Sequence, residues 1–177
     1  RRHYQVKRLE AIDTKIDTLY TGTFSAIEKK NLSPHKHSFL EIMFIDDGCG
    51  IIEIDKKSYE AKKDDLVIYL PSKMHLEYSN TGSIMHATFF GVKYTDSLKK
   101  MFENNKPSYI LPSGKEAALF SKLFKMLIEE SKDMDIPYSD KITNCIVKTI
   151  ILKILQISSD NKEPAKSNEF VKSMQSY

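Results

Sequence analysis

The sequence is poor in cysteine and carries no dense run of one charge. Its two cysteines, Cys49 and Cys145, lie far apart and fit no metal-binding spacing such as Cys-x2-Cys. We therefore expect two unlinked, reduced thiols that pack as small hydrophobic side chains. The formal net charge is only +3 and the lysine pairs are scattered. We therefore do not expect this segment to bind nucleic acid by itself.

Signatures of membrane insertion, secretion and common catalytic chemistry are missing as well. No uninterrupted apolar stretch reaches the roughly 18 residues that cross a bilayer, and no secretory signal opens the chain. Both absences predict a cytoplasmic protein. Gly-x-Ser-x-Gly, P-loop and Gly-x-Gly-x-x-Gly motifs are absent. Any enzymatic activity would depend on a bound metal, and we do not expect an enzyme.

Short apolar segments bounded by turn residues fill the first half of the chain. They recur roughly every eight to twelve residues, which is typical of an all-β sandwich or barrel. Continuous apolar runs among them indicate strands that are covered on both faces. After one or two strands between residues 16 and 24, we predict strands at 35–45, 51–54, 58–61, 66–70, 75–78 and 84–92.

Helical periodicity replaces this pattern after residue 95. A short helix is predicted at 96–104, and a longer one begins with Ser113 as N-cap and Glu116 in a capping box. One face of that longer helix repeats hydrophobic side chains at helical spacing: Phe120, Leu123, Phe124, Leu127 and Ile128. A further helix opens with Pro137, whose fixed φ suits a helix start.

The helix after Pro137 has an unusually wide apolar face. One interpretation is burial against both the barrel and the neighbouring helix. The other is that the extra width packs on a second subunit, because isoleucines form a rigid seam that favours a specific dimer. The second interpretation predicts a homodimer through Ile146, Val147, Ile150, Ile151 and Ile154.

Both ends of the sequence suggest a segment of a longer protein. The chain begins with Arg1 rather than methionine, and residues 159–168 are polar enough to form a linker. A new helical pattern starts at Glu169 and stops at Tyr177.

The segment Pro34–Glu41 holds the side chains best suited to a site. His35, His37 and Glu41 share strand parity and should point the same way, with His75 joining them if the strands curl into a barrel. Phe39, of the same parity, could form an apolar wall, and Tyr69 could donate its hydroxyl. Three interpretations stay open: a metal site, a metal-free pocket for a small molecule, which we favour, and structural hydrogen bonding.

These residues also carry a family resemblance. His35-x-His37-x3-Glu41-x6-Gly48 resembles the first cupin motif from its first histidine onward, although Lys29 stands where that motif opens with glycine. The second cupin motif matches poorly. Pro71-x3-His75 is instead similar to the sensing domains of AraC-type regulators.

The resemblance to AraC-type regulators implies a mainly β fold with helices. A cupin-like barrel (double-stranded β-helix or jelly roll) would span residues 1–112. An antiparallel two-helix hairpin would span 113–158 and mediate dimerisation. Residues 159–177 would form a linker and the start of a truncated helix-turn-helix domain.

The resemblance implies that this is the effector-sensing and dimerisation domain of a bacterial transcription regulator. DNA would be bound through a missing C-terminal domain, and neither a metal nor another cofactor is expected. The alternative is a metal-dependent cupin enzyme such as a dioxygenase or isomerase. The residues expected to bind a small effector are His35, His37, Phe39, Glu41, Tyr69 and His75.

Overall fold

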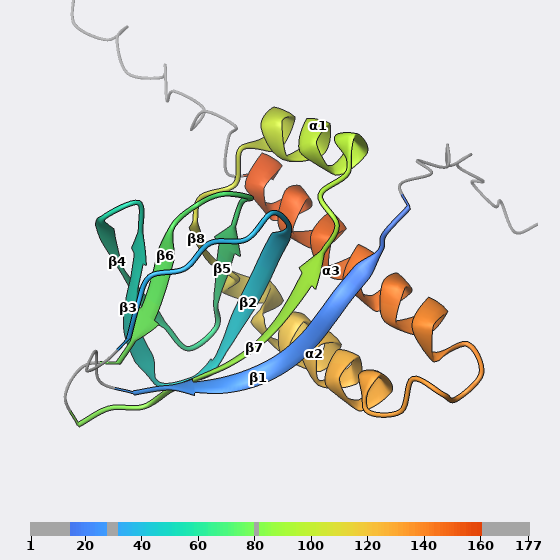
Figure 1. Ribbon diagram of the computed structural model, residues 1–177, viewed down its shortest axis with the longest axis horizontal. Helices are drawn as coiled ribbons and strands as arrows, with labels where there is room; N and C mark the ends of the chain where they lie inside the picture. The colour runs from blue at the N-terminus through green and yellow to red at the C-terminus, as the bar shows by residue number, and fades with distance from the viewer. Residues whose placement is uncertain (1–14, 28–31, 80–81, 161–177) are drawn as a thin grey trace, which may run out of the picture.

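The computed structural model describes residues 15–27, 32–79 and 82–160. Within these ranges seven strands come first, followed by a helix, a short eighth strand and two further helices (Figure 1). The elements are β1 (Thr18–Ala26), β2 (Leu40–Asp47), β3 (Cys49–Ile54), β4 (Lys57–Lys62), β5 (Asp65–Tyr69), β6 (His75–Tyr78), β7 (Met85–Val92), α1 (Asp96–Asn105), β8 (Ile110–Pro112), the 3-10 turn η1 (Gly114–Glu116), α2 (Ala117–Ser131) and α3 (Ser139–Asp160).

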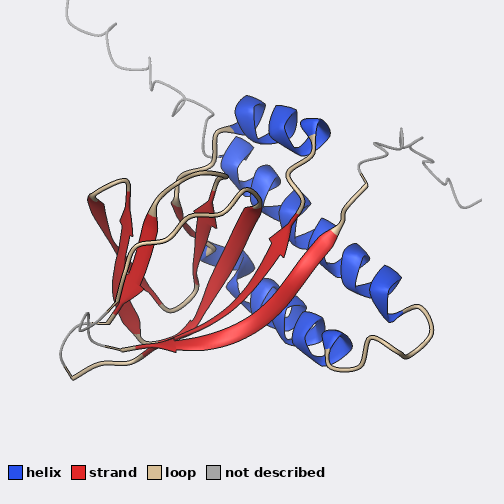
Figure 2. Cartoon of the chain, viewed as in Figure 1, coloured by secondary structure: helices blue, strands red, loops and turns tan. Residues whose placement is uncertain are grey.

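Two antiparallel sheets make up the all-β sandwich or barrel that the strand pattern predicts. The larger sheet has the order β1-β7-β2-β5-β8, and the smaller has the order β4-β3-β6. The helices gather on the side of the larger sheet that faces away from the smaller one (Figure 2). The large sheet is thus covered on both faces, which explains the continuous apolar runs in its strands.

Strand alternation divides the apolar side chains between two cores. On β2, Ile42 and Phe44 pack toward the helices, whereas Met43 and Ile45 pack between the two sheets. We call the second cluster the inner core. The same division along β5 places Tyr69 in the inner core.

Helix α2 packs directly on the large sheet. The Phe124 ring lies 5.3 Å from the ring of Phe44 and 5.7 Å from that of Phe90. Helix α3 lies alongside α2 and contributes to the same core. It is also tied to β1, because the backbone N–H and the hydroxyl of Thr18 both donate to Asn144 Oδ1, at 2.9 and 2.7 Å.

Several element boundaries differ from the sequence prediction. Strand β2 begins at Leu40 rather than at residue 35, because the chain before it meets β6 only through an isolated bridge at His35. Ser113 does not cap a helix; its hydroxyl donates to the Asp64 carbonyl, at 2.6 Å. Helix α3 begins at Ser139, two residues after Pro137.

The residues predicted for the dimer seam require correction. Ile146, Val147, Ile150, Ile151 and Ile154 are at most 7% exposed and belong to the core within a single chain. The wide apolar face of α3 is therefore internal packing, which is the other interpretation of its width. These five side chains do not reach a second subunit in this arrangement.

Two further expectations differ from the structure. Helix α3 is long and apolar enough for a membrane span, although core helices pass the same test and 44% of its most apolar window is buried inside the protein. Cys49 and Cys145 are unlinked, as expected, but both are exposed rather than packed.

Candidate functional site

A cluster of polar side chains occupies one end of the inner core. His75 and Glu77 lie opposite Ile54 and Ile52 in the β3–β6 register. Directly opposed residues of an antiparallel pair share a face of the sheet. Because Ile52 and Ile54 are inner-core residues, His75 and Glu77 also point between the sheets.

The larger sheet contributes a second pair of side chains to this end of the barrel. Glu41 on β2 lies opposite Tyr69 on β5. Tyr69 belongs to the inner core and is fully buried. No partner lies within 3.5 Å of its hydroxyl among the described residues. Burial raises the pKa of this hydroxyl, as do the charge of the Glu77 carboxylate and the approach of that carboxylate to the hydroxyl.

The segment before β2 brings two more histidines to the cluster. His35 and His75 exchange two backbone hydrogen bonds, at 2.8 and 2.9 Å, and the His37 carbonyl accepts one from the Ser72 N–H, at 2.8 Å. As a result, the ring of His75 lies 4.3 Å from that of His35 and 4.8 Å from that of His37. The three imidazoles converge although they do not share a strand.

Backbone carbonyls orient two of these imidazoles. His37 Nδ1 lies 2.9 Å from the Phe39 carbonyl oxygen, and His75 Nδ1 lies 2.8 Å from that of Lys73. A carbonyl can only accept, so both Nδ1 atoms carry hydrogen. Burial lowers the pKa of both rings, that of His75 to about 4, so at neutral pH each ring is uncharged and each Nε2 holds a lone pair.

Those two Nε2 atoms are buried without a hydrogen-bond partner among the described residues. The nearest acidic oxygen to His37 Nε2 is Glu41 Oε1, at 3.8 Å, which is beyond hydrogen-bond distance. Buried polar atoms are nearly always paired. The two unpaired nitrogens therefore indicate a site where a donor or a metal ion would be accommodated.

Glu41 is held by a tyrosine that the sequence analysis did not single out. Tyr20 and Glu41 flank Gly91 from the two neighbouring strands, and the Tyr20 hydroxyl donates to Glu41 Oε2. A Cβ atom on Gly91 would lie 2.5 Å from Tyr20 Cε1, so only glycine leaves the ring room to cross. Burial raises the pKa of Glu41 to about 7, against the lowering effect of the Tyr20 bond.

Aromatic rings line one side of the cluster. Phe39 stacks on His37 with ring centroids 4.0 Å apart and an interplanar angle of 5°. Tyr20 meets Phe39 edge-on at 5.2 Å and Phe89 at 5.8 Å. Tyr69 stacks on His75 at 4.0 Å. The site therefore combines polar side chains, the histidines and carboxylates, with an aromatic wall of apolar rings on one side.

The ligand atoms of these side chains form two groups that could hold a metal ion. His37, Glu41 and His75 form one, and His35, His75 and Glu77 form the other, with the ligand atoms of each group within 4.8 Å of one another. Imidazole nitrogen and carboxylate oxygen suit divalent transition metals. With a lone pair free on His75 Nε2, the residues present fit such an ion.

The structure gathers the six predicted pocket residues into one cluster, although unequally. His35 is exposed, His37, Phe39 and Glu41 are half-buried, and Tyr69 and His75 are buried. Tyr20 and Glu77 were missed. Glu77 lies two residues after His75 on the same strand, so strand alternation could have identified it, whereas no local pattern indicates the Tyr20–Glu41 bond.

Comparison with known proteins identifies the kind of domain. A family profile described as "AraC-like ligand binding domain" matches residues 24–133. Apo ToxT from Vibrio cholerae is 11% identical, with a TM-score of 0.54, and the match covers 82% of this chain and 58% of that one. A cupin protein from Bacteroides fragilis is 16% identical, with a TM-score of 0.40, over 53% of this chain and 89% of that one. No curated protein matches the sequence.

The raised pKa of Glu41 makes the stability of the protein depend on pH. The pKa of Glu41 is about 7 in the folded protein, and its ordinary value is 4.5. Ionisation of Glu41 therefore favours the unfolded state, so its contribution to stability is fully present below pH 4.5 and is lost as the pH rises through 7. Glu41→Gln should therefore gain stability relative to the unmodified protein between these values, by up to about 3 kcal/mol. Urea unfolding across this pH range measures the difference.

The exposed Glu60 of β4 provides the matched control. The difference in unfolding free energy between Glu60→Gln and the unmodified protein should not change over the same pH range. A difference between Glu41→Gln and the unmodified protein that does not change with pH would contradict the burial of an ionisable Glu41.

Proposed function

Because the chain belongs to the family of AraC-like ligand binding domains, we propose that it is the effector-sensing and dimerisation domain of a bacterial AraC-type transcription regulator. The strands would bind a small molecule, and α2 and α3 would pair with a second copy. DNA would be contacted by a separate domain of the full regulator. A sensor rather than an enzyme fits a family that is defined by ligand binding.

One observation carries the proposed small-molecule site. Three buried polar atoms, His37 Nε2, Tyr69 Oη and His75 Nε2, lack partners among the described residues. They come from side chains that the fold brings together at one end of the inner core. A ligand that bonds to all three would recover the free energy that each unpaired group costs, about 1–3 kcal/mol.

The chemistry of these atoms favours a neutral ligand that carries hydroxyl groups. Both imidazole nitrogens can only accept hydrogen bonds, whereas the Tyr69 hydroxyl can accept or donate. With both rings uncharged, the cluster offers no positive charge to a carboxylate or phosphate. The aromatic wall formed by Tyr20, Phe39 and Phe89 would cover the apolar face of such a molecule, as in a sugar.

The proposed dimer contact is the outward face of α3. Ile142, Cys145, Thr149, Leu152 and Gln156 are all exposed and uncharged. They recur at alternating intervals of three and four residues, the spacing of a coiled-coil seam. Leu152 and Thr149 also line an open groove of about 510 Å³ between α1 and α3, which could receive side chains of a second copy.

Strand β1 offers a physical connection between the two proposed sites. On this strand, Tyr20 bonds to Glu41 of the polar cluster. Thr18 bonds to Asn144 of α3, and the Thr21 hydroxyl donates to Ser131 of α2, at 2.7 Å. A ligand that favours one position of Tyr20 would thereby favour one arrangement of the helices. Such differential affinity is what coupling between two sites requires.

The ligand proposal predicts a specific response of Tyr69→Phe. The variant removes only the unpaired hydroxyl, so the free protein should melt at the same or a higher temperature. Thermal melting should be measured with a panel of pentoses, hexoses and aromatic acids. At least one sugar should raise the melting temperature of the unmodified protein, and its affinity for Tyr69→Phe should be about two- to tenfold weaker.

Tyr94→Phe, in the loop before α1, is the matched control and should respond like the unmodified protein. The proposal fails if no compound in the panel shifts the melting temperature, or if the shift is the same in Tyr69→Phe.

The dimer proposal predicts opposite outcomes for two neighbouring positions on α3. Leu152 is 42% exposed, whereas Ile150 is fully buried. Leu152→Asp should leave the melting temperature nearly unchanged but convert a dimer to a monomer in sedimentation at micromolar concentration. Ile150→Asp should unfold the domain, because it buries an unpaired charge. Sedimentation of the unmodified protein as a monomer would contradict the proposal.

A further inference from the structure

We propose that Asp55, an exposed residue outside the polar cluster, determines which ring nitrogen of His75 is presented to the proposed effector. It acts through the peptide group that joins Lys73 to Met74, so it is a positioning residue and does not contact the ligand. This inference rests on the proposed function, because His75 supplies one of the buried acceptors of the proposed effector site.

One peptide group lies between the Asp55 carboxylate and the His75 ring. Its N–H belongs to Met74 and donates to Asp55 Oδ1, at 3.1 Å. Its carbonyl belongs to Lys73, and His75 Nδ1 lies 2.8 Å from this oxygen. A peptide group is planar, with its N–H and its carbonyl on opposite edges. A bond that holds the N–H toward Asp55 therefore also holds the carbonyl toward His75.

Asp55 is itself fixed by the turn between β3 and β4. It has a φ of +48°, and the next residue, Lys56, has a φ of +70°, as in a two-residue hairpin turn. The Asp55 N–H donates to the Met74 carbonyl, at 2.8 Å, and Asp55 Oδ2 accepts from Lys73 Nζ, at 2.7 Å. An exposed ion pair adds little to stability, but this one leaves Oδ1 directed to the Met74 N–H.

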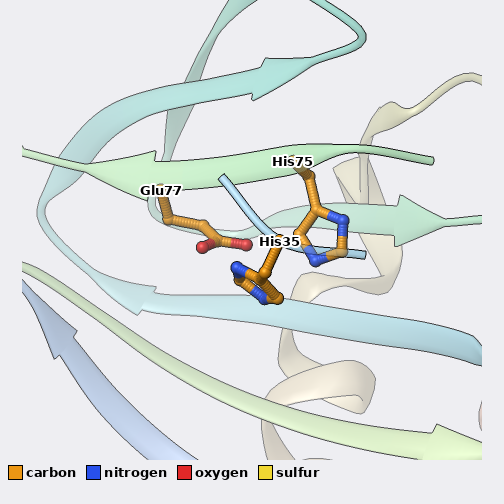
Figure 3. Close-up of side chains that lie close together, drawn as sticks. All are labelled: His35, His75 and Glu77. Atoms are coloured by element: carbon orange, nitrogen blue, oxygen red, sulfur yellow. The ribbon is translucent and has the colours of Figure 1, made fainter. Parts of the chain in front are cut away.

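The Lys73 carbonyl is the contact that selects the tautomer of His75. Tyr69 stacks on the ring with centroids 4.0 Å apart, but a half-turn of the ring about its Cβ–Cγ bond would keep the same plane. A carbonyl can only accept, so it requires hydrogen on Nδ1 and leaves Nε2 as the buried lone pair. In Figure 3 the His75 ring lies beside that of His35, and Glu77 projects from the same strand.

The charge of Asp55 also strengthens the acceptor that His75 uses. Hydrogen bonds to ionised groups are stronger than neutral ones, and linked hydrogen bonds polarise one another. The carboxylate at the Met74 N–H makes the Lys73 carbonyl a better acceptor for the His75 Nδ1–H. His75 Nε2 in turn becomes a better acceptor for a ligand hydroxyl. Loss of the carboxylate should therefore weaken ligand binding although Asp55 lies outside the pocket.

The test is Asp55→Gly, which removes the carboxylate but keeps the turn, because glycine adopts a positive φ freely. In long-range ¹H–¹⁵N correlation spectra, His75 should carry hydrogen on Nδ1 alone in the unmodified protein and should show both tautomers in the variant. His37 should not change, since its Nδ1 bonds to the Phe39 carbonyl outside this loop. The sugar that stabilises the unmodified protein should bind the variant about two- to tenfold more weakly.

Lys56→Gly is the matched control, because Lys56 is exposed and has the next positive φ of the same turn. It should change neither the His75 spectrum nor the sugar affinity. Asp55→Asn keeps an Oδ1 acceptor for the Met74 N–H, so it should restore hydrogen to His75 Nδ1. Circular dichroism and melting temperature check that each variant is folded. The inference is overturned if His75 keeps hydrogen on Nδ1 alone in Asp55→Gly, or if Lys56→Gly changes the tautomer as much.

The spectra and the sugar panel together separate this inference from the proposed function. A sugar that binds Asp55→Gly as tightly as the unmodified protein, with the His75 tautomer unchanged, would overturn the positioning role and leave the sensor intact. A mixture of His75 tautomers in Asp55→Gly, with no compound of the panel bound by the unmodified protein, would support the positioning role and contradict the organic effector.

Discussion

The site depends on the hydrogen bonds that two histidines donate to the main chain. His37 and His75 each direct Nδ1–H to a carbonyl two residues away. Because both acceptors are backbone atoms, the local chain path fixes the ring orientations. The opposite nitrogens are then left as buried acceptors without a partner among the described residues, and the proposed effector site follows from that arrangement.

The proximity of this cluster to the helices follows from the sheet order. β1 is an edge strand of the large sheet, separated from β2 by β7, and Gly91 on β7 leaves the gap that Tyr20 crosses to reach Glu41. The same strand is hydrogen-bonded to α2 and α3. A change at the cluster thus has a short path to the helices, through β1 and its hydrogen bonds with α2 and α3.

Local patterns in the sequence were sufficient for most of the fold and for part of the site. Turn residues and alternation located most of the strands, and parity placed Glu41 on the inner face although β2 begins only at Leu40. Contacts between residues far apart in the sequence could not be predicted from local patterns. The Tyr20–Glu41 bond depends on register across three strands, and the burial of Ile150 in its own chain depends on how α3 packs on the sheet.

The protonation state of His37 and His75 decides whether this cluster presents acceptors or donors. Long-range ¹H–¹⁵N correlation spectra of the imidazole rings at neutral pH distinguish the two neutral tautomers from the charged form. We expect both histidines to be neutral, with hydrogen on Nδ1 and a lone pair on Nε2. Spectra that show hydrogen on Nε2, or charged rings, would contradict it, because the pocket would then present donors where acceptors are required.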